Sequence, residues 1–419
     1  MAVVHLAVTG LIFPSIYCLI RQFAAGIADR SEPQGVFQQL TAKHSLNRLR
    51  IQGQCFFDRN AGNSNVCSTL CGEHRRIWQE AMTLGPRIER IEPQFAAANG
   101  YVHIMPAGLS VEPRRLNVTV GGQEAVIKAA GPKRVVVQLP EAFTGEPECV
   151  VESGIDITPS FRHAFPNAKA DRLHNVGNPA VDPATGAIYA TRSGGRGMQL
   201  TNTLYRLETD GYLDELPVQV MNPSGLAFGP DGKLYVTNRA LGELYVIDND
   251  LEATRIASGL GIATGIAFDK NGLIYIGDRS GTIFRSEPGG IPEQFAMIEP
   301  SVAAFHLAFG PDGRLYVTAP GLASRDAIYV VDKEGRVETF LRAFGRPQGL
   351  AFDRDGNIYL AANHQGRQGI FRVSPAKEVE WIASAHAPVG LCFTAKGEMV
   401  IATHNELYSF DADIFGTLV

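Results

Sequence analysis

The chain has 419 residues, a formal net charge of −5 and a hydrophobic fraction of 45%. These values indicate a globular protein of two or three domains with a buried core, and they exclude a disordered chain. Because the charge offers no basic stripe for phosphates to follow, no nucleic acid is expected as a partner, and binding to a membrane surface is disfavoured for the same reason.

Residues 1–81 differ from the rest in their pattern of apolar residues. They show neither the alternation of a β-strand nor a sustained helical periodicity. One interpretation is that they are an upstream extension and that translation starts at Met82, which predicts a cytoplasmic protein. The other is that they are native. Residues 2–20 form an apolar run just long enough to span a bilayer, and residues 25–28 resemble a cleavage site, so this second interpretation predicts an exported or membrane-tethered protein. No membrane is expected unless residues 2–20 are inserted.

Four of the six cysteines fall within residues 1–81. Cys67 and Cys71 have the spacing of half a zinc site, but no second pair completes it. Cys149 and Cys392 stand alone in the remaining sequence, as ordinary core cysteines of a reducing compartment do.

Short alternating runs begin at Tyr101, Leu116 and Val135, with Gly121-Gly122 and Pro132 between them. Strands at this spacing predict a β-sandwich over residues 85–152. The order of these runs, with NVTVGGQEAVI followed by VVVQLP, resembles the IPT/TIG immunoglobulin-like fold. That resemblance implies a spacer or an interaction module, and no catalytic constellation stands out in this segment.

A repeat dominates residues 160–419. Each unit reads apolar-small-Phe, a turn with Gly, and aliphatic-Tyr-aliphatic, as in PSGLAFGPDGKLYVTN and PQGLAFDRDGNIYLAA. Asp-Gly and Asn-Gly favour tight hairpin turns, and a second strand pair follows each hairpin, which makes four strands in about 40 residues. The six turn glycines are Gly186, Gly232, Gly272, Gly313, Gly356 and Gly397. The sequence therefore predicts an all-β protein, a six-bladed β-propeller after an immunoglobulin-like sandwich; an open solenoid is the alternative.

In a propeller blade the innermost strand and its neighbour are antiparallel, so the start of the first and the end of the second meet at one mouth. Polar residues at such a concave mouth predict a binding site, and arginines there suit a carboxylate or another small anion. The predicted ligand-binding residues are Asn178, Arg192, Ser224, Asn238, Arg239, Thr264, Asp278, Arg279, His306, Gln348, Asn363 and His404. His306 stands where most other units have a small residue, and either acid/base chemistry or a structural hydrogen bond explains it.

The unit PxGLAFDxxGxLYVxD resembles the propellers of the gluconolactonase, senescence marker protein and luciferin-regenerating-enzyme group, and equally the NHL repeats. The resemblance implies a divalent cation, commonly calcium, that is held in the channel by Glu, Asn and Asp and polarises a lactone carbonyl. The matching positions here are Asn178, Ser224, Thr264, Gln348 and Val389. None of them is a carboxylate, although Asp278 of the neighbouring ring is a candidate ligand, so no metal site is assigned.

Two functions follow. The first is a propeller that binds a small anionic or sugar-derived ligand, or a partner protein, at the channel mouth. The alternative is a divalent-metal-dependent hydrolase of a sugar lactone or related ester, with His306 and Asp278 as its catalytic residues.

Overall fold

A computed structural model describes residues 85–143, 148–194 and 200–417. The predictions for residues 1–81, including the apolar run, the start at Met82 and the Cys67–Cys71 pair, lie outside these ranges. Within them, no helix has the length and hydropathy needed to cross a membrane.

The first part of the described chain is a β-sandwich, as the alternating runs predicted. One sheet has the order β1 (Arg87–Glu92), β3 (Tyr101–Ala107), β7 (Arg134–Gln138), β6 (Val126–Gly131). The other has the order β10 (Phe161–Arg162), β8 (Glu148–Ser153), β4 (Leu116–Val120), β5 (Gln123–Glu124), with β9 (Asp156–Ile157) on β8 and the short 3-10 turn η2 (Pro113–Arg115) before β4. Alternate residues of these strands, such as Val102, Val118 and Val135, are fully buried between the sheets.

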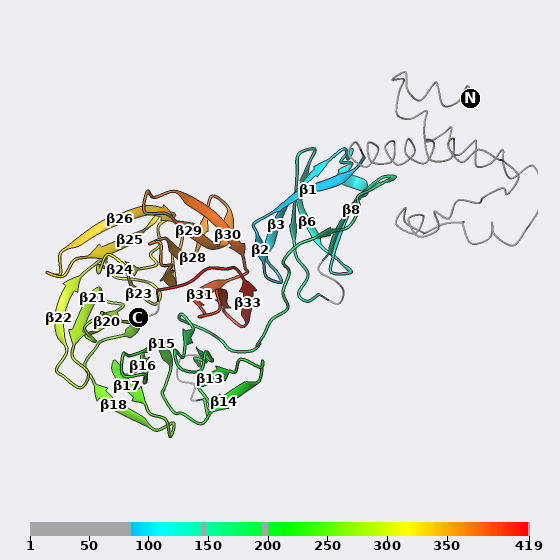
Figure 1. Ribbon diagram of the computed structural model, residues 1–419. Helices are drawn as coiled ribbons and strands as arrows, with labels where there is room; N and C mark the ends of the chain where they lie inside the picture. The colour runs from blue at the N-terminus through cyan, green and yellow to red at the C-terminus, as the bar shows by residue number, and fades with distance from the viewer. Residues whose placement is uncertain (1–84, 144–147, 195–199, 418–419) are drawn as a thin grey trace, which may run out of the picture. The chain divides into compact units, whose positions relative to one another are not determined.

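The rest of the described chain is the six-bladed propeller, and Figure 1 shows its blades face on, arranged in a ring. The first three sheets are β11 (Ala180–Val181), β12 (Ile188–Thr191), β13 (Leu204–Leu207), β14 (Leu213–Leu216); β15 (Pro223–Phe228), β16 (Leu234–Asn238), β17 (Glu243–Ile247), β18 (Ala253–Ala257); and β19 (Ala263–Phe268), β20 (Ile274–Asp278), β21 (Thr282–Ser286), β22 (Glu293–Met297).

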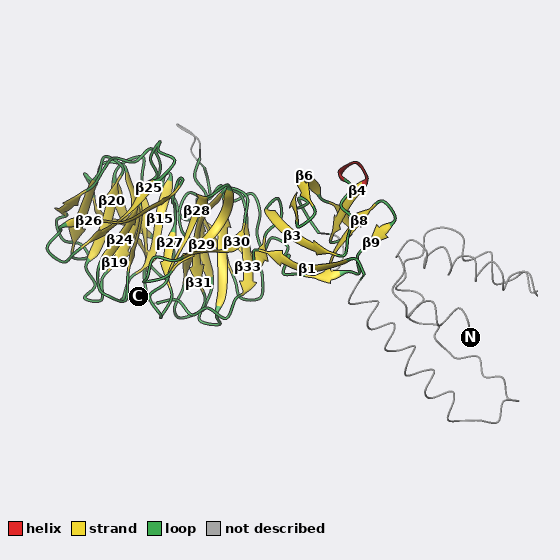
Figure 2. Ribbon diagram, turned by 90° about the horizontal axis from the view of Figure 1, so that it is seen from above, coloured by secondary structure: helices red, strands yellow, loops and turns green. Residues whose placement is uncertain are grey.

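The remaining blades continue this pattern, and Figure 2 shows the propeller from another side, with strands dominating throughout. Their strands are β23 (His306–Phe309), β24 (Leu315–Thr318), β25 (Asp326–Val331), β26 (Val337–Phe344); β27 (Leu350–Phe352), β28 (Ile358–His364), β29 (Arg367–Val373), β30 (Val379–Ser384); and β31 (Pro388–Phe393), β32 (Glu398–Thr403), β33 (Leu407–Asp411). The short strand β2 (Phe95–Ala96) pairs in parallel with β30 at the edge of the fifth sheet.

The repeated Tyr and Phe are explained by contacts between blades. In the first five blades the tyrosine of the second strand packs edge to face against the phenylalanine of the next blade's innermost strand, as Tyr235 does on Phe268 with ring centroids 4.9 Å apart. The pairs Tyr189–Phe228, Tyr275–Phe309, Tyr316–Phe352 and Tyr359–Phe393 repeat this contact. Each aromatic pair thus joins consecutive sheets. The repeated Tyr and Phe of the sequence motif are the residues that hold neighbouring blades together.

The last blade has only three strands of its own, and a segment from before the first blade lies along its outer edge. The amide of Lys169 donates to the carbonyl of Leu407 at 2.8 Å, the Leu407 amide donates to Ala170 at 3.0 Å, and the Leu173 amide donates to Asn405 at 2.9 Å. Leu173 is fully buried in a cluster with Val400 and Leu407. The ring is therefore closed by residues that do not belong to the repeat.

This closure predicts a large effect at Leu173. Replacing it by alanine should lower the free energy of unfolding by about 2–5 kcal/mol, because the side chain is fully buried and the hole it leaves cannot be filled. Denaturant unfolding of Leu173→Ala measures this, with Leu241→Ala as the control because Leu241 is 58% exposed. Equal stability of the two variants would contradict the closure.

Candidate functional site

The strand register brings two sets of residues to one mouth of the channel. In the second, third and sixth blades the first residue of the innermost strand pairs with the last residue of its neighbour: Pro223 with Asn238, Ala263 with Asp278, and Pro388 with Thr403. Residues just before the first member and just after the second therefore lie at the same end of each blade.

A cavity of about 500 Å³ opens among these residues, within the size range of small-molecule sites. It contains six of the predicted ligand-binding residues: Arg239, Thr264, Arg279, Gln348, Asn363 and His404. The sequence missed others that line it, chiefly Asn175, Val302, Arg346 and Gln368. Among the described residues that line this cavity, three are arginines and none is Asp or Glu.

Arg239 and Arg279 are close enough to interact. Burial lowers the pKa of the Arg239 guanidinium, and the positive charge of Arg279 lowers it further. Nη2 of Arg279 donates to the carbonyl of Val302 at 2.5 Å, while its Nε is enclosed with no partner among the described residues. Neither guanidinium forms an ion pair with a carboxylate that the structure describes. The cavity therefore carries positive charge that nothing in its lining neutralises.

His174 adds to the same neighbourhood. Its ring lies 4.3 Å from that of His404, centroid to centroid. Burial lowers the pKa of His174 first, and the charges of His404, Arg239 and Arg192 lower it further. Positive charge at this mouth is thus large enough to disfavour another cation beside it.

Arg346 was missed because it stands before the first residue assigned to the innermost strand. Its backbone has a φ of 48°, and its amide donates to Oδ2 of Asp326 at 3.2 Å. Gly345-Arg346-Pro347 forms a bend before the innermost strand, and Arg346 lines the cavity from this bend. The Gly-Arg-Pro sequence was visible, but the prediction took only one residue of this blade start, Gln348, as ligand-binding.

Two predicted residues serve the loops instead of the cavity. Oδ1 of Asn238 accepts from the amides of Ala240 and Leu241 at 3.0 and 3.2 Å. Oδ1 of Asp278 accepts from the amide of Ile262 at 2.7 Å, and its Oδ2 accepts from the hydroxyl of Ser280. Both side chains are buried, and both stabilise the turns that follow their strands.

Arg192 is also absent from the lining of the cavity, because its Nη1 donates to the hydroxyl of Tyr205 at 2.9 Å. A long side chain at a strand exit turns toward the nearest acceptor, and here that acceptor lies within its own blade. The position of Arg192 at the end of its strand does not by itself predict the direction of its side chain.

Asn178, Ser224 and His306 line a second, enclosed space of about 20 Å³, to which Thr264 also contributes. Oγ of Ser224 and Nε2 of His306 are buried there with no hydrogen-bond partner among the described residues. The space is large enough for one water molecule, and two polar atoms without partners are what such a water needs. The Asn178 amide is satisfied: its Nδ2 donates to Leu350 at 3.0 Å, and its Oδ1 accepts from Leu391.

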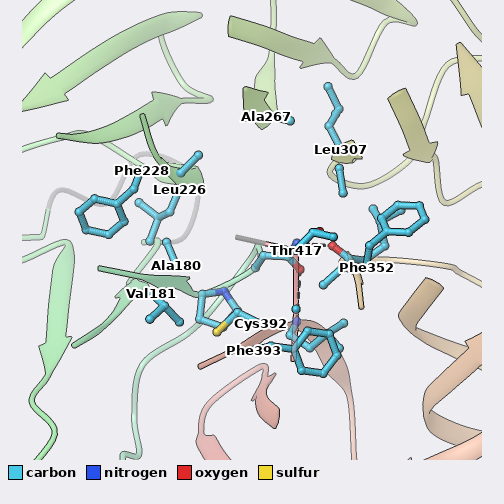
Figure 3. A pocket seen from close by; sticks show the side chains of 18 of the residues that line it. Ala180, Val181, Leu226, Phe228, Ala267, Leu307, Phe352, Cys392, Phe393 and Thr417 are labelled. Atoms are coloured by element: carbon cyan, nitrogen blue, oxygen red, sulfur yellow. Dashed lines mark hydrogen bonds between the residues drawn. The ribbon is translucent and has the colours of Figure 1, made fainter. Parts of the chain in front are cut away.

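The other end of the channel is apolar. A space of about 190 Å³ there is lined by alanine, leucine and phenylalanine side chains of the innermost strands. The amide of Thr417 donates to the carbonyl of Phe352 at 3.0 Å, and Figure 3 shows Thr417 among the side chains of this space. Among the described residues that line this space, few side chains are polar, Asn178 and Thr417 among them, so this end of the channel is the less polar of the two.

The channel residues do not fit a calcium-type cation. Hard cations prefer several carboxylate or carbonyl oxygens, whereas the innermost positions offer Asn178, Ser224, Thr264 and His306. The nearby Asp278 carboxylate already accepts three hydrogen bonds, two from Ser280 in the turn that follows it and one from the amide of Ile262 before β19. Within the described part of the chain, no group of three or more His, Cys, Asp or Glu is placed to hold a metal.

His306 should make stability depend on pH. Burial lowers its pKa from 6.5 to about 4, so the imidazole stays neutral in the folded protein. Between pH 6.5 and pH 4 the unfolded chain binds more protons than the folded one. The free energy of unfolding therefore decreases as the pH is lowered through this range. The loss approaches about 3 kcal/mol as pH falls to 4.

Urea unfolding of wild type and His306→Gln between pH 7 and pH 4.5 measures this loss. The stability difference between them should shift in favour of the variant as pH falls. An exposed histidine, His386, gives the control variant His386→Gln, whose curve should stay parallel to that of wild type. A parallel curve for His306→Gln would show that the ring is hydrated in the folded protein.

The comparisons with known proteins agree with the fold. No family model matches the chain. A gluconolactonase of Zymomonas mobilis subsp. mobilis is 26% identical in an alignment of 209 positions that covers 47% of this chain and 56% of that protein. The chain thus matches little more than half the length of this curated relative.

Among solved structures, one described as a candidate gluconolactonase is 19% identical, with a TM-score of 0.51, over 59% of this chain and 92% of that one. An auxiliary nutrient binding protein from Bacteroides ovatus is 14% identical with a TM-score of 0.47, over 78% of this chain and 98% of that one. The Zymomonas relative and the structure with a TM-score of 0.51 support the predicted likeness to gluconolactonase-type propellers. The IPT/TIG likeness of the sandwich stays a prediction.

Proposed function

We propose that the protein binds a small anion, through a carboxylate or phosphate group, in the arginine-bearing cavity. The observation that carries this proposal is the lining itself: among the described residues it holds Arg239, Arg279 and Arg346, and no acidic side chain. A partly buried guanidinium without a counter-ion is unfavourable, and an anion that brings the counter-charge is bound in compensation.

The geometry suits a ligand that is fixed by hydrogen bonds as well as by charge. Nη2 of Arg279 is held by the Val302 carbonyl, so its remaining donors are oriented before the ligand arrives. Gln348 is held in the same way, because its Nε2 donates to the carbonyl of Pro388 at 3.1 Å. Asn363 and His404 supply further polar groups at the wall. In this proposal the sandwich over residues 85–152 is an IPT/TIG-like spacer, and a partner protein with an acidic anchor is the other ligand that the cavity admits.

Anion binding should depend on Arg239. Phosphate and citrate are expected to raise the melting temperature of the wild-type protein, and Arg239→Gln should weaken their binding at least about tenfold, since a charge-assisted hydrogen bond contributes roughly 1.5–3 kcal/mol. Binding should also weaken with added sodium chloride. Thermal shift and isothermal titration calorimetry measure both effects.

Arg336→Gln is the matched control, because Arg336 is exposed and paired with Asp332 in a turn outside this cavity. It should bind both anions as the wild type does. If Arg239→Gln and Arg336→Gln bind equally well, the cavity is not the anion site.

A metal-dependent lactonase is the second candidate, and the observation in its favour is the similarity to the gluconolactonase of Zymomonas mobilis. It would use His306 and Asp278 as catalytic residues. The residues around the channel argue against it. The Asp278 carboxylate already accepts hydrogen bonds from Ile262 and Ser280, and burial alone lowers the pKa of His306, with no carboxylate beside it to make it a stronger base. We therefore rank binding above hydrolysis.

Calcium separates the two candidates. Addition of millimolar calcium chloride should leave the melting temperature unchanged. Asp278→Asn should lower the free energy of unfolding by about 1–3 kcal/mol with or without calcium, because it weakens hydrogen bonds to Ile262 and Ser280. Calcium-dependent hydrolysis of gluconolactone that disappears in Asp278→Asn would establish the lactonase instead.

A further inference from the structure

The arginine-bearing cavity is amphiphilic. Beside its three arginines, its lining contains two short apolar runs, Val302 to Ala304 and Ala387 to Val389. These residues offer no side-chain hydrogen bonds to a ligand. Hydroxyl groups of a ligand placed against them would lose their bonds to water without replacement, which disfavours a polyhydroxylated ligand at this part of the wall.

The rim around the same mouth is apolar and exposed. Leu241 is 58% exposed, Ile262 is 44% exposed and Val302 is 45% exposed. All three lie beside the cavity arginines: Leu241 is two residues after Arg239, the Ile262 carbonyl accepts from the Arg279 amide at 3.3 Å, and the Val302 carbonyl accepts from the Arg279 side chain. The apolar rim therefore adjoins the positive charge on consecutive blades.

Two further exposed side chains extend this rim. Met221 precedes Asn222, whose carbonyl accepts from the Arg239 amide at 3.3 Å. Leu322 follows Pro320, whose carbonyl accepts from the Val302 amide at 3.0 Å, and it is 93% exposed. Neighbouring apolar side chains left in water around a polar cavity are a common mark of a binding surface.

We propose that the cavity selects amphiphilic anions: a carboxylate carried on an apolar chain or ring, as a free small molecule. The carboxylate binds Arg239 and Arg279, and the apolar body contacts Val302, Ile262 and Leu241. This inference rests on the proposed function for the head group and narrows it by excluding sugar acids as preferred ligands. A free molecule is favoured over a membrane lipid because the arginines lie within a cavity and the net charge of −5 repels an anionic membrane.

A series of straight-chain carboxylates tests this directly. Isothermal titration calorimetry with butanoate, hexanoate and octanoate below their micelle concentrations should show affinity rising toward octanoate. A fully buried methylene is worth about fourfold in affinity, and partial burial at the rim still predicts a gain of about tenfold or more across the series. Gluconate should bind more weakly than octanoate.

Rim variants identify where the chain lies. Val302→Ser and Ile262→Ser should flatten the dependence on chain length, so that octanoate loses more affinity than butanoate does, since each variant keeps its backbone carbonyl. Ile291→Ser is the matched control, because Ile291 is 93% exposed and stands outside the lining of this cavity. It should show the wild-type series.

Each remaining outcome has a distinct meaning. If phosphate binds in an Arg239-dependent way but octanoate binds no better than butanoate, the inference is wrong and the proposed function stands. If no anion binds, both fail. If octanoate does not bind but the protein binds phosphatidylglycerol vesicles through Val302 and Ile262, the apolar rim recognises a lipid surface and the inference is overturned.

Discussion

The antiparallel register between the innermost strand of each blade and its neighbour is the constraint on which the rest of this molecule depends. Because the turn glycines hold that register, residues before one strand and after the next lie at the same end of the channel. Arg239 and Arg279 are separated by 40 positions, yet both line one cavity, and the charge of Arg279 lowers the pKa of Arg239 there. A slip of one residue would turn alternate side chains to the opposite face and disperse that site.

Ring closure converts this local register into a cavity. Five blades are joined to the next by tyrosine–phenylalanine contacts, whereas the sixth has no such tyrosine and is completed by backbone bonds from residues 169–175. Asn175, in that closing segment, also lines the cavity, and its Nδ2 donates to the Thr403 carbonyl at 2.9 Å. The segment that closes the ring thereby forms part of the wall of the proposed site.

The sequence predicted the sandwich, the six blades and the mouth at which polar residues gather, because hairpin turns and strand alternation are local and repeated. It did not predict the closing segment, since residues 169–175 have no counterpart elsewhere in the chain. It also misplaced Asp278 and Asn238 as ligand-facing residues. The Asn238 side chain accepts from an amide of its own turn and the Asp278 side chain accepts from the amide of Ile262 in the loop before β19; residue spacing alone does not predict these side-chain directions. Arg346 was overlooked for a related reason, because it precedes the strand whose start was used to count positions.

The central claim is that unneutralised positive charge at one mouth of the propeller holds an anion. A crystal structure of the protein grown with selenate tests it most directly, because selenium can be located by its anomalous scattering. We expect a selenium peak within hydrogen-bond reach of Arg239 and Arg279, and loss of that peak in Arg239→Gln. A fully occupied selenate elsewhere, with only water between these two arginines, would contradict it.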